Sequence, residues 1–120
     1  MDTSVWVRGL RGAQAYQPYL DQLLASRAVG AHALIHGELL AGDSGGRRDL
    51  LAAMELLPWA STLNHEEAVT FARAHKLPGR GLAWVDMHLL ASAAQQGWRL
   101  WSADERLAAA ANEMGIGWRP

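Results

Sequence analysis

Helix start and stop signals, separated by short apolar segments, most restrict what this chain can fold into. Asn64-His65-Glu66-Glu67 and Ser102-Ala103-Asp104-Glu105 have the form of capping boxes, and glycines stand where the helices would end. The predicted helices run from Pro18 to about Ala28, from Ala33 to Ala41, from Arg47 to Leu57, from Asn64 to about Lys76, from Trp84 to Gln96, and from the second capping box to Met114.

Two short apolar segments follow the glycines that end predicted helices. Trp98 to Trp101 and Ile116 to Trp118 are predicted strands. Strands that alternate with helices are typical of an α/β domain with a parallel sheet, and 120 residues suit a single domain. In such sheets, functional sites form at the carboxyl ends of the strands, so acidic side chains near those ends are the first candidates.

The composition narrows the chemistry that the chain can perform. The sequence has no Cys, so a metal would be held by oxygen or imidazole ligands. The net charge is −1, which disfavours broad coating of nucleic acid, but ten of the eleven basic residues are Arg, the better residue for binding phosphate. No apolar run reaches the length of a membrane span and no signal peptide is recognisable, so we expect a cytoplasmic protein that does not enter a membrane.

Four acidic residues have settings that point to a metal site. Glu38 and Asp86 each lie among apolar neighbours, where a carboxylate loses hydration and needs a cation or strong donors. Asp104 follows a predicted strand and lies in the first turn of the next helix, and Asp2 opens the chain. Each has an ordinary structural alternative as well: Asp86 as a helix N-cap, Asp104 as a first-turn acid, Glu38 on a helix surface and Asp2 as a solvated terminal residue.

The order and spacing of four motifs carry more weight than any single acid. They are Asp-Thr-Ser-Val-Trp at the start, Gly-Glu-Leu-Leu-Ala-Gly around Glu38, Val-Asp-Met-His-Leu-Leu-Ala-Ser-Ala around Asp86, and Leu-Trp-Ser-Ala-Asp-Glu-Arg-Leu around Asp104. In this arrangement the sequence resembles the PIN-domain family, and in particular the VapC-type toxins of bacterial toxin–antitoxin modules. The resemblance runs essentially from end to end.

The resemblance implies a three-layer α/β/α domain over residues 1–120, with a short parallel sheet, that acts as a Mg²⁺- or Mn²⁺-dependent endoribonuclease. Asp2, Glu38, Asp86 and Asp104 correspond to the family's acids. Asp2, Asp86 and Asp104 are predicted metal ligands, and Glu38 is predicted to orient water or complete the ligand shell. Thr3, Ser4 and Ser102 are predicted supporting residues, and Arg106 is a candidate for contact with the RNA.

The resemblance also implies partners and one departure. A VapB-like antitoxin is expected to inhibit the protein, the RNA is its substrate, and a homodimer is the expected assembly. Family members have a few apolar residues before the first acid, whereas only Met1 precedes Asp2 here. We therefore expect the first strand to be shortened or missing, which makes the position of Asp2 less secure than that of Asp86 and Asp104.

Three other interpretations stay open. The chain could be a PIN-like interaction module that binds a partner without catalysis, as its six Trp would allow. A receiver-like or phosphatase domain would need a Lys near a strand-end Asp, and Lys76 lies elsewhere. His32 and His36 have the spacing of zinc ligands on a helix, but the HExxH motif is absent.

Overall fold

The computed structural model describes residues 30–46 and 48–118 of the chain. They belong to two compact units, a first unit that extends to Ala60 and a second unit that begins at Ser61. The predicted helix from Pro18 to Ala28, the predicted helix start at Arg47, and the predicted site residues Asp2, Thr3 and Ser4 lie outside the described residues.

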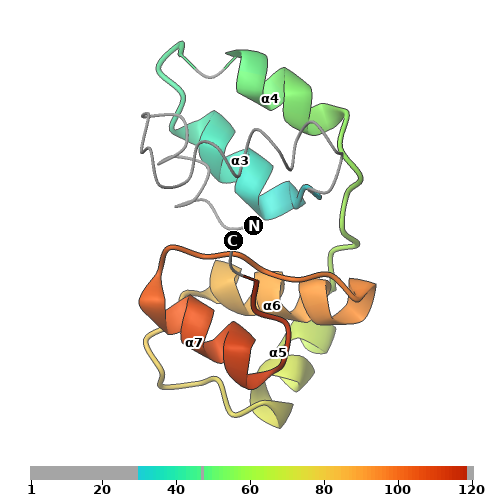
Figure 1. Ribbon diagram of the computed structural model, residues 1–120, viewed down its shortest axis with the longest axis vertical. Coiled ribbons are helices and arrows are strands. Elements are labelled where there is room, and N and C mark those ends of the chain that lie inside the picture. The colour runs from blue at the N-terminus through green and yellow to red at the C-terminus, as the bar shows by residue number, and fades with distance from the viewer. Residues whose placement is uncertain (1–29, 47, 119–120) are drawn as a thin grey trace. The chain divides into compact units, whose positions relative to one another are not determined.

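In the described part of the first unit, two helices pack against each other, α3 (Ala33–Ala41) and α4 (Arg48–Glu55) (Figure 1). Ile35 and Leu39 lie one turn apart on α3, and they are buried together with Met54 of α4. Burial of each such side chain is worth roughly 1.5–3 kcal/mol, so these three residues stabilise the fold of this unit.

A backbone bridge joins the segment just before α3 to the segment after α4. Ala31 pairs in parallel with Trp59: the Ala31 N–H donates to the Pro58 carbonyl at 2.8 Å, and the Ala60 N–H donates to the Ala31 carbonyl at 2.8 Å. Ala31 is buried, so these hydrogen bonds satisfy backbone groups that water does not reach.

The second unit contains three helices, α5 (His65–Ala74), α6 (Trp84–Gln96) and α7 (Glu105–Glu113). The predicted capping box of α5 is confirmed: Asn64 Oδ1 accepts from the Glu67 N–H at 2.8 Å, and Glu67 Oε1 accepts from the Asn64 N–H at 3.1 Å. Gly97 ends α6 in the left-handed region, with φ 70°. The bounds of α3 and α6 coincide with the predicted bounds, whereas α4 and α5 end two residues early, at Glu55 and Ala74.

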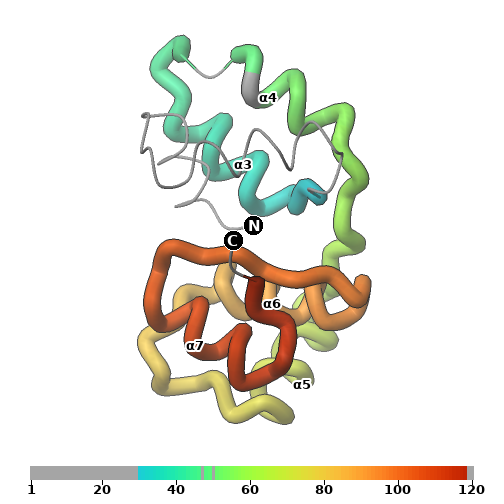
Figure 2. The backbone as a smooth tube through the Cα atoms, viewed as in Figure 1, coloured from blue at the N-terminus to red at the C-terminus, as the bar shows by residue number. Residues whose placement is uncertain are grey.

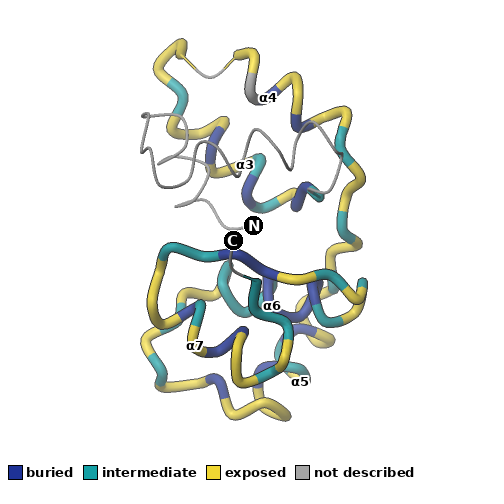
Figure 3. Tube along the Cα trace, viewed as in Figure 1, coloured by how far each residue is buried: buried dark blue, intermediate teal, exposed yellow. Residues whose placement is uncertain are grey.

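Small and aliphatic side chains form the core of the second unit. The buried faces of α6 and α7 are dark in the burial colouring (Figure 3), whereas their outer turns are exposed. The buried apolar residues of this unit are Ala68, Ala72, Leu77, Leu89, Leu90, Ala91, Ala93, Leu100, Trp101, Leu107, Ala110 and Ala111. Because alanine side chains are small, the helix backbones can pack close to one another, and the core needs few large side chains.

The chain makes a second parallel bridge between Leu100, which lies between α6 and α7, and Gly117, which follows α7. The Leu100 N–H donates to the Ile116 carbonyl at 2.8 Å, and the Trp118 N–H donates to the Leu100 carbonyl at 3.0 Å. The Trp101 and Trp118 rings meet edge to face beside the bridge, with centroids 5.1 Å apart. Figure 2 follows this path, in which α6 and α7 both begin at the left of the view and run to the right.

The predicted strands are therefore shorter in the structure than in the sequence prediction. Within residues 30–46 and 48–118, parallel pairing is limited to the two single-residue bridges. The strand through Leu100 is short because only four residues separate the Gly97 cap from Ser102. Ser102 would be the next residue to pair after Leu100, but it is held in the turn into α7 by its hydrogen bond with Asp104. Because no sheet is formed in these ranges, the predicted α/β/α arrangement with its parallel sheet stays a prediction. No helix in the described part of the chain combines the length and apolar character of a membrane span.

Candidate active site

Asp86 lies in the first turn of α6 and turns back on the start of its own helix. Its Oδ2 accepts a hydrogen bond from the N–H of Ala83, the extended N-cap residue, at 2.9 Å. The side chain is half-buried. The sequence alternative that made Asp86 an N-cap is wrong by three positions, because Ala83 occupies the cap and Asp86 supplies the acceptor that Ala83 lacks. The carboxylate is thereby held in one orientation by the backbone.

Asp104 is the N-cap of α7. Its Oδ1 accepts from the backbone N–H groups of Arg106 at 2.9 Å and Leu107 at 3.1 Å. The predicted capping box that began at Ser102 is therefore wrong. Ser102 Oγ instead accepts from the Asp104 N–H at 2.9 Å, so the serine supports the residue that caps the helix. The cap occupies Oδ1, and the residue is exposed at the N-terminus of α7.

A side chain in the first turn of α7 contacts the loop before α6. Gly81 has φ +77°, and a Cβ at this position would come 2.5 Å from Nη1 and 3.1 Å from Cζ of Arg106. The Arg106 guanidinium therefore lies over the Gly81 backbone. Arg106 is two residues beyond Asp104 in the sequence, and Gly81 is five residues before Asp86. One residue earlier in the same loop, Arg80 Nη1 forms an ion pair with Glu113 Oε2 at 2.8 Å. Arg106, two residues beyond Asp104, thus contacts the loop that leads into α6, the helix that carries Asp86.

The remaining predicted acids have different settings. Glu38 lies in the middle of α3 in the first unit and is exposed, so the expectation that its apolar neighbours remove its hydration is wrong. Its neighbour Leu39 takes the buried side of the helix instead. Asp2, with Thr3 and Ser4, lies outside the described residues. Within the residues that the structure describes, no group of three His, Asp or Glu side chains lies close enough to hold a metal.

The two histidines with zinc-like spacing are engaged separately. His32 is the N-cap of α3, and its Nδ1 accepts from the Leu34 N–H at 3.1 Å. His36 packs its ring against Trp59, with centroids 5.3 Å apart, and its Nε2 lies 3.8 Å from Glu55 Oε1, too far for a hydrogen bond. These contacts support the ordinary structural interpretation of the pair.

Sequence reasoning missed a ring cluster at the start of α6. The Trp84 ring meets His88 edge to face at 4.9 Å, and it meets His65, the first residue of α5, at 5.3 Å. Burial lowers the pKa of His88, and the neighbouring charge of His65 lowers it further. The helical spacing of Trp84 and His88 was visible in the sequence, but the contact with His65 depends on how α5 packs against α6.

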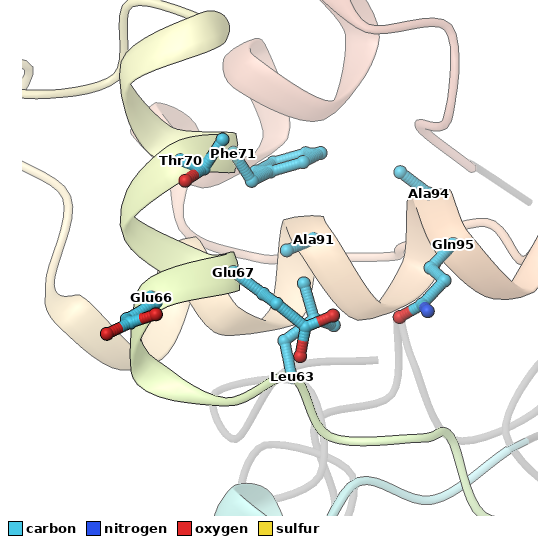
Figure 4. Close-up of a pocket in the computed structure, with 8 residues that line it drawn as sticks. All are labelled: Leu63, Glu66, Glu67, Thr70, Phe71, Ala91, Ala94 and Gln95. Atoms are coloured by element: carbon cyan, nitrogen blue, oxygen red, sulfur yellow. The ribbon is translucent and has the colours of Figure 1, made fainter.

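An open groove of about 680 Å³ lies between α5 and α6. Phe71 reaches from α5 toward Ala91 of α6 in the close-up (Figure 4), and the Glu66 carboxylate points outward. The groove is mainly apolar, and its charged lining residues, Glu66 and Glu67, are both acidic. Phosphate groups would be repelled there, so the groove is a poor candidate for the RNA site.

Comparison with known proteins defines the class. The PIN domain family profile matches residues 1–113, and the chain belongs to this family. Two curated relatives carry the name Ribonuclease VapC32, from Mycobacterium tuberculosis strains CDC 1551 / Oshkosh and ATCC 25618 / H37Rv. Each is 40% identical to the chain over 120 residues, which covers 97% of this chain and 92% of the relative.

Proposed function

We propose that the protein is a divalent-metal-dependent endoribonuclease that acts as the toxin of a toxin–antitoxin pair. The observation that carries the proposal is the end-to-end likeness to a PIN-domain ribonuclease, together with Asp86 and Asp104, each held by backbone N–H groups at the start of a helix in the second unit. Because its substrate is cellular RNA, we place its action in the cytoplasm.

The donor chemistry of the site suits Mg²⁺ or Mn²⁺. Asp86 and Asp104 offer carboxylate oxygens, which these hard cations prefer, and the chain has no thiolate that would favour a softer metal. We propose that Asp2, Asp86 and Asp104 hold the metal and that Glu38 orients water. When bound, the metal would supply charge neutralisation at the phosphate and activation of the attacking water.

The chain's own residues have distinct roles in this proposal. The hydrogen bond from Ala83 aims the Asp86 carboxylate, and the backbone N–H groups that open α7 fix the orientation of the Asp104 carboxylate. Ser102 holds the Asp104 backbone in place. Arg106 lies in the first turn of α7 with its guanidinium over Gly81, in the loop that leads into α6, where it can bind a phosphate oxygen of the RNA strand.

Conversion of Asp86 to Asn tests the catalytic proposal, because Asn can still accept from Ala83 but lacks the charge. Purified chain without antitoxin is incubated with a mixed RNA pool in Mg²⁺, Mn²⁺ or EDTA. We expect metal-dependent cleavage by the parent and a loss of at least about 100-fold in Asp86→Asn, beyond what outer-shell changes typically cause. Glu105→Gln, an exposed acid beside Asp104, is the matched control and should cleave like the parent.

A VapB-like antitoxin and a homodimeric assembly complete the proposal. Exposed apolar side chains support a surface that a partner would cover: Leu40 is 56% exposed and Leu56 is 88% exposed, both in the first unit. The same surfaces would suit the second candidate function, a PIN-like module that binds a partner without catalysis. If the parent cuts no RNA in either metal but still binds its antitoxin, the interaction module is the better description.

A further inference from the structure

The exposed aromatic side chain at the start of α6 has no role in the chemistry described above. Trp84 is the first residue of the helix and is 39% exposed. Its indole is nevertheless held from two sides: His88 meets it edge to face, with an interplanar angle of 87°, and His65 of α5 meets it at a tilt of 54°. The ring is thus fixed by two elements of the second unit while a large part of its surface faces solvent.

A single exposed tryptophan is common on protein surfaces, so its setting has to carry the argument. Ring contacts from two helices limit the rotamers of Trp84, and a rigid, exposed, planar side chain loses little conformational entropy when a flat ligand stacks on it. Aromatic side chains of this kind bind unpaired bases in single-stranded nucleic acid, because every base has a π-face.

Helix geometry places the Trp84 ring close to Asp86 but not at the reacting phosphate. Two residues along a helix correspond to a rise of about 3 Å and a rotation of ~200°, so the two side chains leave different sides of the first turn. With its side chains a helix is about 10–12 Å across, which sets the scale of their separation. A base on Trp84 would therefore belong to a nucleotide next to the scissile phosphate.

We propose that Trp84, held by His65 and His88, is a stacking platform for an unpaired RNA base that flanks the cleavage position. This inference rests on the proposed function, because it takes Asp86 and Asp104 as the cleavage site. RNA is favoured over a protein partner by the neighbouring groups: the Arg106 guanidinium lies over the loop that leads into α6, where it can bind the phosphate that follows the stacked base. In a duplex the bases are stacked on each other, so the platform selects single-stranded RNA.

The first test measures binding of a labelled short single-stranded RNA of mixed sequence to the full chain in EDTA, where cleavage is suppressed. We expect Trp84→Leu to weaken binding by about 5- to 100-fold, the range that loss of one stacked base predicts, and Trp84→Phe to recover most of it. Trp59→Leu is the matched control, because Trp59 is 38% exposed but lies in the first unit. A duplex of the same sequence should bind the parent and Trp84→Leu equally.

The second test locates the stacked base along the RNA. Single abasic nucleotides are scanned through the RNA, and the abasic position that weakens binding to the parent should have no further effect on Trp84→Leu. Additive losses at every position would overturn the platform, as would equal losses in Trp84→Leu and Trp59→Leu. Unchanged RNA binding with weakened antitoxin binding would assign Trp84 to a protein interface instead.

The outcomes separate this inference from the proposed function. RNA binding that depends on Trp84 in EDTA, without any metal-dependent cleavage, would contradict the proposed nuclease activity but not the stacking of a base on Trp84. Cleavage by Trp84→Leu with the parent's KM and kcat would contradict the platform alone, whereas a raised KM at unchanged kcat supports it.

Discussion

At the residue scale, Asp104 combines a structural and a proposed catalytic role. One carboxylate oxygen, Oδ1, accepts the two N–H groups that open α7, and the same carboxylate is a proposed metal ligand. Substitutions that keep the cap but remove the charge therefore separate the two roles. Asn and Asp are comparable caps, whereas Ala has no acceptor.

We expect Asp104→Asn to keep the parent's stability and to lose RNA cleavage by at least about 100-fold. Asp104→Ala should lose cleavage to the same degree and in addition about 1 kcal/mol of unfolding free energy, since the N-cap is gone. Urea unfolding and the cleavage assay measure the two effects separately. Equal stability of the Asn and Ala variants would show that the cap contributes little.

The lowered pKa of His88 predicts a pH dependence of stability. Burial lowers the folded-state pKa below the ordinary value of 6.5, so the unfolded chain takes up this proton at a higher pH than the folded chain does. Stability from this group is complete above the unfolded pKa and is lost as pH falls through 6.5 toward the folded value. In EDTA, the melting temperature of His88→Gln should fall less than that of the parent between neutral and mildly acidic pH; identical slopes would contradict the prediction.

At the scale of the elements, the helices follow local signals and the bridges do not. The Asn64 capping box and the Gly97 stop lie within a few residues of the helices they define, so the sequence was sufficient to place α5 and α6. The bridge of Leu100 depends on Ile116 and Trp118, on the far side of α7. Its short length could not be predicted, because Ser102 was available both to extend the strand and to support Asp104.

Two glycine substitutions test the packing at this scale. A Cβ on Gly117 would overlap the Asn112 side chain, so Gly117→Ala should cost about 1–3 kcal/mol of unfolding free energy and disturb the bridge to Leu100. Gly37, in the middle of α3, has no atom within 4 Å of its Cβ position, and Gly37→Ala should stabilise the chain by about 0.5–1 kcal/mol. Denaturant unfolding of both variants should shift in opposite directions; a neutral Gly117→Ala would mean that Asn112 moves aside without cost.

At the scale of the whole molecule, the proposed metal site links folding to the cation. A metal that binds only the folded chain adds about 2.7 kcal/mol when its concentration is 100 times its dissociation constant. We expect Mn²⁺ to raise the melting temperature of the parent by several degrees and to leave the Asp86→Asn, Asp104→Asn double variant unchanged. An equal shift in both proteins would place the cation elsewhere.

The sequence by itself determined the positions of the helices, the PIN-domain family and the acids around which a site is proposed. These depend on caps, glycine stops and motif spacing, which are interactions and patterns among residues close in the chain. Asp86 and Asp104 were singled out in this way, and their role as metal ligands stays a prediction.

Only the tertiary structure decided the setting of the individual side chains. It made Asp104 rather than Ser102 the cap of α7, left Glu38 exposed, and set Trp84 between His65 and His88. The physical reason is the same in each case. The exposure of a side chain and its ring contacts depend on how elements distant in sequence pack. Whether Ser102 or Asp104 caps α7 depends on the path that the packed chain takes into the helix.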